Sequence, residues 1–307
     1  MGKQGFFAPR EDAYTPLQVI RATRGAVMAK SCVKPFEYPV QILVTAGGNE
    51  LERAAAELAS VCLHRNILGV HVSFRPDSNK NQRWTAMPSV SRVPLKSLLA
   101  ASPSPLPESG VGLILRETLE GLEWLHRVGG EAHGGICADN VYMDAEQFWM
   151  PKLGFPELMC RKKKTTAECW AAPERVHGKA ADVWAFGLFA LELVYGGEIP
   201  ASTYAGLRKL LEDNFVGPKT TWFPTSWNRL LLFKNKKNKK GMVRISESLG
   251  YLIRDCLRED PRERPSSTQL LQEHPYFVGG SINGGSRKEV KEALANQFKK
   301  AEGRARY

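Results

Sequence analysis

The sequence predicts an α+β protein with two lobes, a small strand-rich lobe followed by a larger helical lobe. Between Tyr14 and Ser89, short segments alternate apolar and polar residues, which is the period of a half-buried strand. After that point, apolar residues recur at the three- and four-residue spacing of helices that face a core. The chain has 307 residues, of which 43% are hydrophobic, enough to bury two such cores.

The strand-rich lobe is placed at residues 14–89, after a polar N-terminal tail at 1–13. PVQILVT (39–45), HVSF (71–74) and RWTAM (83–87) are its predicted strands. ELERAAAELASVCL (50–63) is its predicted helix, for which Asn49 is an N-cap with Glu52 three residues on.

The helical lobe is placed at residues 90–277 and forms one domain, 14–277, with the strand-rich lobe. In the helix predicted at 109–130, four apolar residues share one face: Val111, Leu115, Leu119 and Leu122. The segment 182–197 is apolar nearly all round, which indicates a central buried helix. A flexible linker and a basic C-terminal helix are predicted at 278–307, where three residues form a narrow apolar stripe: Val290, Leu294 and Phe298.

Composition narrows the environment and the kind of partner. The net charge of +11 favours anionic partners such as acidic proteins, phosphates or membrane surfaces. Six scattered cysteines without a CxxC pair argue for reduced thiols, and no apolar run is long enough for a transmembrane segment. We therefore expect a cytoplasmic protein, with the nucleus as the alternative location.

Five motifs occur in a fixed order in the helical lobe: WLH before HGGICADN, KLGF, CWAAPE, ADVWAFGLFALEL and LREDPRERPSSTQLLQEHPYF. In this order and spacing they resemble a protein kinase domain, and more narrowly the sterile-20 group with its oxidative-stress-responsive and plant relatives. The resemblance spans about 14–277 and implies the bilobal kinase fold. It also implies structural roles for Glu174 and Arg264 as an ion pair, for Asp182 as acceptor from the AHGG loop, for Trp184 beside it, and for His133 in the core.

The residues that the resemblance assigns to phosphoryl transfer are replaced. Leu43 stands in place of the phosphate-binding lysine, and Gly135 in place of the catalytic aspartate. Gly154 and Phe155 occupy the segment where a metal-binding aspartate is needed, and no aspartate occurs between Asp144 and Asp182. A positioned base alone contributes about 10²–10⁴ in rate. We therefore predict no catalytic residues in this chain.

The resulting hypothesis is a pseudokinase, not an enzyme, that acts as a scaffold or allosteric partner of a protein such as an active kinase. It predicts no cofactor, with ATP binding weak or absent; Met87 and Asn140 are the nucleotide contacts if ATP does bind. One alternative is a weak or unconventional serine/threonine kinase that uses Asp139 and Asn140. A second alternative is an anion-binding module that uses the basic loops.

Two lysine-rich loops lie in the helical lobe, RKKKTT (161–166) and LFKNKKNKKG (232–241). The first contains Thr165 and Thr166, candidate regulatory phosphorylation sites, because the resemblance places them in the activation segment. Both loops favour an acidic protein or an anionic surface as a partner. No aromatic residues alternate with the lysines, which argues against nucleic acid.

Overall fold

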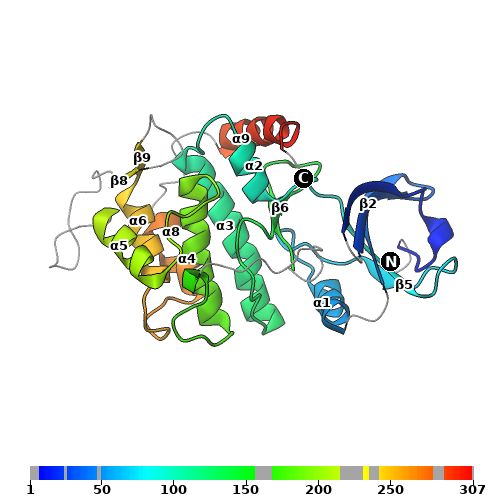
Figure 1. The fold of residues 1–307 in the computed structure, drawn as a ribbon, viewed down its shortest axis with the longest axis horizontal. Coiled ribbons are helices and arrows are strands. Elements are labelled where there is room, and N and C mark those ends of the chain that lie inside the picture. The colour runs from blue at the N-terminus through cyan, green and yellow to red at the C-terminus, as the bar shows by residue number, and fades with distance from the viewer. Residues whose placement is uncertain are drawn as a thin grey trace.

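The computed structural model describes residues 7–23, 26–46, 50–155, 168–214, 231–234, 242–278 and 287–305. It has two lobes, an antiparallel sheet of five strands and a larger group of helices (Figure 1). The predicted α+β, two-lobed fold is thus confirmed. Among the described residues, no helix combines the length and the apolar composition needed to cross a bilayer.

The sheet of the first lobe has the strand order β1-β2-β3-β5-β4. Its strands are β1 Gln18–Thr23, β2 Ala26–Val33, β3 Tyr38–Ala46, β4 Val72–Phe74 and β5 Gln82–Pro88. Helix α1, Glu50–Val61, connects β3 to β4. The three strands predicted from the sequence agree with β3, β4 and β5 to within one residue at each end. β1 and β2 were not predicted as strands, because basic residues and a glycine interrupt their apolar pattern.

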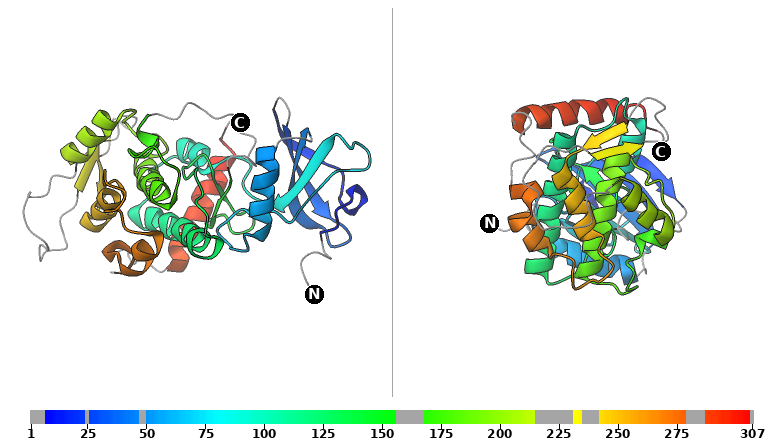
Figure 2. Two further views of the ribbon diagram at one scale, coloured as in Figure 1. Left: turned by 90° about the horizontal axis from the view of Figure 1, so that it is seen from below. Right: turned by 90° about the vertical axis from the view of Figure 1, so that its left-hand side faces the viewer.

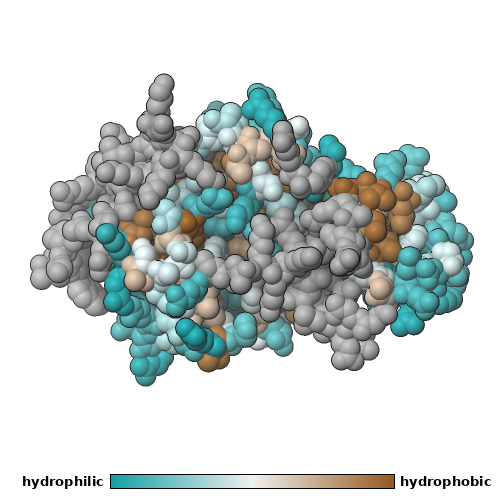
Figure 3. Space-filling model, viewed as in Figure 1, coloured by the Kyte–Doolittle hydropathy of each residue, from teal (hydrophilic) through white to brown (hydrophobic). Residues whose placement is uncertain are grey.

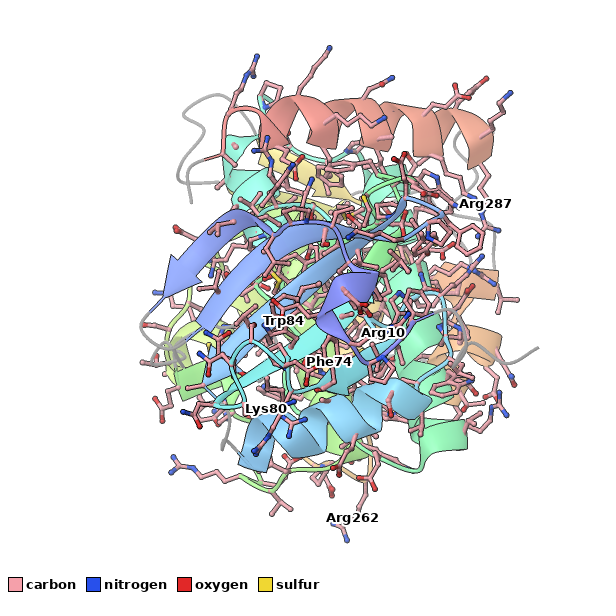
Figure 4. All side chains as sticks on the ribbon, turned by 90° about the vertical axis from the view of Figure 1, so that its right-hand side faces the viewer. Arg10, Phe74, Lys80, Trp84, Arg262 and Arg287 are labelled. Carbon is pink, nitrogen blue, oxygen red and sulfur yellow. The ribbon has the colours of Figure 1, made fainter. Side chains whose placement is uncertain are left out.

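Alternation along β3 gives the sheet two different faces. Val40 and Ile42 are fully buried in a cluster with Phe74 and Trp84, whose ring centroids are 6.0 Å apart (Figure 4). Leu43 points the opposite way, toward the helical lobe, and belongs to a different cluster. Register therefore decides which residues of β3 meet the second lobe.

The helical lobe packs around the central helix α4, Lys179–Tyr195, which is buried along most of its length. On α3, Glu108–Trp124, all four residues of the predicted apolar face are buried. The other helices are α2 Leu95–Ala101, α5 Tyr204–Asn214, α6 Glu247–Cys256, α7 Ser267–Glu273, α8 Pro275–Val278 and α9 Arg287–Glu302. Two hairpins complete the lobe, β6 Val141–Met143 with β7 Pro151–Leu153, and β8 Leu231–Lys234 with β9 Met242–Ile245.

Helix α9 lies across α2 and α3, as two perpendicular views show (Figures 1 and 2). Of its predicted apolar stripe, Leu294 and Phe298 are buried in the core of the helical lobe, and Val290 packs against that core. The linker predicted before it, 279–286, lies outside the described residues.

The lobes are connected by the chain between β5 and α2, and backbone bonds also join them. The amide of Ser91 donates to the carbonyl of Met143 at 2.7 Å, and the amide of Leu68 donates to the carbonyl of Leu153 at 2.9 Å. The β6–β7 hairpin is therefore bonded to the strand-rich lobe at Leu68 and to the interlobe connection at Ser91.

Close packing of α4 against α6 depends on Gly187. A Cβ atom at this position would lie 2.8 Å from Cβ of Cys256 and 2.9 Å from Cγ of Leu257. We expect Gly187→Ala to lower the free energy of unfolding by about 1–3 kcal/mol, because the two helices must move apart. Urea denaturation would measure this. Gly303→Ala is the control, since its Cβ would be 3.7 Å from the nearest atom; equal effects of the two variants would contradict the prediction.

Candidate functional site

The candidate site lies where the sheet of the first lobe meets the β6–β7 hairpin and the loop 132–140. Here both lobes contribute to one buried apolar group, called the interlobe cluster. Its members include Met28, Leu43 and Met87 from the sheet and Leu125, Tyr142 and Phe155 from the helical lobe.

Asp182, in the first turn of α4, holds the loop 132–140 in place. Its carboxylate accepts hydrogen bonds from the amides of His133 at 2.6 Å and Gly134 at 2.8 Å. The ring of His126 lies 2.9 Å from the same carboxylate and 3.0 Å from the hydroxyl of Ser267. Gly134 has φ 72°, which favours glycine at this turn. The sequence analysis did not single out His126, although it lies in the WLH motif.

His133 packs in the core of the site. Its ring stacks on Phe155 with centroids 5.0 Å apart. Burial lowers the pKa of His133 to about 4, so the ring is neutral near pH 7. The neutral, buried ring therefore packs in the core of the site.

Asn140 brings together the two glycines that the sequence identified as replaced positions. Its Nδ2 donates to the carbonyl of Gly135 at 2.7 Å, and its own carbonyl accepts from the amide of Gly154 at 2.8 Å. Gly135 and Gly154 thus offer only backbone groups. Asn140 thus connects the loop 132–140 to the end of β7.

Asp139, the base proposed in the alternative from the sequence, faces away from this loop centre toward α2. Its Oδ2 lies 3.2 Å from Nζ of Lys96, which is also 3.8 Å from the carboxylate of Glu192. Glu192 accepts from the amide of Ala138 at 2.6 Å, and burial raises its pKa to about 7. The geometry therefore engages Asp139 in an ion pair and gives no support to its use as a base. In the sequence, this group of Lys96, Asp139 and Glu192 was indicated only by Glu192, a glutamate within the apolar segment that forms α4.

The cleft face of the sheet is closed by apolar side chains and one amide. Leu43 and Met87 are fully buried, and Nε2 of Gln41 donates to the carbonyl of Val90 at 2.7 Å. Among the described residues, no group of three or more His, Cys, Asp or Glu side chains could hold a metal ion. Lys30 of β2 pairs in register with Gln41 on this face, while Leu43 and Gly154 occupy the positions that the resemblance assigned to a phosphate-binding lysine and a metal-binding aspartate.

Arg264 and Glu174 form a bidentate pair that anchors the segment after Cys169. Arg264 donates to the two carboxylate oxygens of Glu174 at 2.7 and 2.8 Å, and to the carbonyl of Ala180 at 3.0 Å. Its guanidinium lies over Trp184, 5.1 Å from the ring centroid, and Trp184 donates to the carbonyl of Cys169 at 2.9 Å. These three side chains connect three segments of the helical lobe.

Other residues singled out by the sequence lie outside the described residues. These are Thr165 and Thr166, the basic loop before them, and Lys236, Lys237, Lys239 and Lys240. The phosphorylation sites and the anion-binding alternative remain predictions.

Comparison with known proteins identifies relatives of the chain. The family model of the protein kinase domain matches residues 21–277. Germinal center kinase 3 of Caenorhabditis elegans is 27% identical over 249 residues, which cover 72% of this chain and 39% of the relative. The serine/threonine-protein kinases fray2 and fray1 of Dictyostelium discoideum are 25% and 27% identical, covering 87% and 72% of this chain but only 26% and 37% of their own lengths. The chain thus spans less than two-fifths of these relatives.

These matches correct two predictions from the sequence, that the chain is not an enzyme and that it takes no cofactor. Both are wrong by this comparison, because the matched domain is that of protein kinases and the relatives are named as serine/threonine kinases, whose reaction uses ATP and a metal ion. Loss of activity was predicted from four positions, Leu43, Gly135, Gly154 and Phe155, whereas the family match extends over residues 21–277.

Arg264 lowers the pKa of Glu174 by hydrogen bonding to its carboxylate. A carboxyl whose pKa is lower in the folded state stabilises the protein above its unfolded pKa, and this contribution is lost as the pH falls through the folded value. We expect Glu174→Gln to cost about 1.5–3 kcal/mol at pH 7, and the cost to shrink only as the pH falls below the unfolded glutamate pKa of ~4.3 toward the lower folded pKa of Glu174.

Urea denaturation at several pH values would measure the difference between the two proteins. Glu263→Gln is the matched control, since Glu263 is exposed and its ion pair with Arg258 is long, at 3.8 Å. A difference for Glu174→Gln that stays constant as the pH falls from 7 to well below the unfolded glutamate pKa of ~4.3 would contradict this expectation.

Proposed function

The chain belongs to the protein kinase family, and we propose on that premise that it works as a sterile-20-like serine/threonine kinase domain. In this role it transfers phosphate from ATP to serine or threonine hydroxyls of a protein. The proposal is supported by the family match over residues 21–277 and by the names of the relatives.

The observation that carries the proposal is that hydrogen bonds hold the loop 132–140 in one conformation. Asp182 binds two successive amides of this loop, and Asn140 binds its Gly135 carbonyl from the other side. A loop held at both ends can position an acceptor hydroxyl, and positioning is a main source of kinase catalysis. Leu43 and Gly135 supply no charge, so we expect turnover below the about 1–100 per second of ordinary kinases.

Transfer of labelled phosphate tests this proposal. The purified chain is incubated with γ-labelled ATP, magnesium and a generic serine/threonine substrate protein. We expect incorporation above background that falls at least tenfold in Asn140→Ala, because the loop loses its bond to Gly135. Asn81→Ala, in the turn before β5, is the control and keeps activity. No incorporation by the unmodified chain, under conditions where an active sterile-20 kinase labels the substrate, would refute the proposal.

A second function, binding of a protein partner as a scaffold or allosteric regulator, is favoured by a separate observation. The cleft face is closed by the interlobe cluster and by the bond from Gln41 to Val90. Apolar side chains gather on the visible surface of the strand-rich lobe (Figure 3). Val19 and Phe36 of this lobe are 65% and 69% exposed. Contiguous exposed apolar patches mark interaction surfaces.

This second function predicts a stable complex with an active sterile-20-like kinase domain. We expect Val19→Asp with Phe36→Asp to weaken that complex at least tenfold, because charge replaces apolar contact. Val176→Asp is the control, since Val176 is equally exposed on the helical lobe. Analytical ultracentrifugation would measure the affinities. Equal weakening by the control would contradict the assignment of this surface.

A further inference from the structure

Helix α9 is anchored at its first residue to a buried carboxylate. Arg287, at the start of the helix (Figure 4), lies 3.1 Å from Oε1 of Glu117 on α3. The Glu117 side chain is fully buried. Its carboxylate also forms an ion pair with Arg65 at 2.9 Å and accepts a hydrogen bond from the side-chain Nδ2 of Asn66 at 3.0 Å. A buried carboxylate depends on such partners, so this end of α9 is part of the core electrostatics.

The middle of α9 is held by close packing against α3 as well as by polar contacts. A Cβ at Gly110 would lie 3.0 Å from Cδ2 of Leu294, so α3 has a glycine where α9 crosses it. Nε2 of Gln297 donates to the hydroxyl of Ser102 at 2.6 Å, and Lys291 lies 3.6 Å from the ring centroid of Trp149. These contacts orient the helix on α2 and α3.

The last turn of α9 reaches the connection between the lobes. Oε1 of Glu302 accepts a hydrogen bond from the backbone amide of Arg92 at 2.6 Å. Arg92 follows the last residue of β5 by four positions and precedes α2. Its side chain is exposed. The bond is charge-assisted and joins the C-terminal helix to the segment about which the lobes would move.

A pocket of about 540 Å³ separates this last turn from the strand-rich lobe. Gln18, Val19, Ile20 and Lys30 line it on one side, and Arg92 and Glu302 on the other. Movement of the lobes would change the separation across this pocket. The bond from the Arg92 amide to Glu302 therefore lies at the edge of this pocket.

We propose that α9 is a strap that restrains the interlobe connection. It is anchored to Glu117 at one end and to the Arg92 amide at the other, and its 16 residues span about 24 Å. Because a helix transmits displacement along its axis, loosening the Arg287 end also loosens the Glu302 end. The proposal concerns lobe motion, and it holds whether or not the chain transfers phosphate.

Hydrogen exchange at the Arg92 amide tests the strap directly. The full chain and two variants, Glu302→Ala and Glu289→Ala, are compared by NMR or by mass spectrometry of peptides that cover residues 89–95. We expect exchange at Arg92 to rise about tenfold or more in Glu302→Ala, because the acceptor is lost. Glu289→Ala, an exposed glutamate in the first turn of the same helix, should leave it unchanged. Unchanged exchange in Glu302→Ala would overturn the proposal.

A double-mutant cycle separates a strap from a local hydrogen bond. Arg287→Ala leaves Glu117 paired with Arg65, so the fold is retained. In a strap, this variant accelerates exchange at Arg92 although Arg287 is at the opposite end, and its effect is not additive with that of Glu302→Ala. If Arg287→Ala raises exchange within α9 and leaves Arg92 unchanged, the two ends are independent and the strap is refuted.

Discussion

The organisation of the site depends on one buried carboxylate, that of Asp182. It accepts the amides of His133 and Gly134 and contacts the ring of His126, so the loop, the helical turn Leu125–Gly129 after α3, and α4 meet at a single group. A carboxylate in this position is costly without its donors, and the donors are costly without it. This mutual requirement holds the start of the loop, while Asn140 and Glu192 bind Gly135 and Ala138 further along it.

The two lobes meet by a different principle, apolar contact. Leu43 and Met87 from the sheet share one cluster with Tyr142 and Phe155 from the helical lobe. The helical side of the site is thus held by hydrogen bonds to buried carboxylates, while Leu43 and Met87 of the sheet side pack in an apolar cluster. The two proposed functions therefore rest on different observations. Family membership supports phosphoryl transfer, and the apolar cleft face supports partner binding.

Prediction from sequence worked best where a motif names both partners of a contact. Glu174 and Arg264 are 90 positions apart, and the family resemblance still paired them, as the structure does. It did not find the bond from Gln41 to Val90 or the pairing of Asp139 with Lys96, because those partners depend on side-chain direction in three dimensions. It was wrong about enzyme status and cofactor, because absent residues are weaker evidence than family membership.

The amino-acid sequence by itself determined the two-lobed α+β fold, since periods of two and of three to four residues define strands and helices locally. It also identified the apolar stripe of α9, with Leu294 and Phe298. Only the tertiary structure decided where that stripe packs and that Glu302 reaches the Arg92 amide. A periodic apolar pattern indicates that one face of a helix or strand is buried. Which surface covers it depends on shape and charge that distant segments bring together after folding.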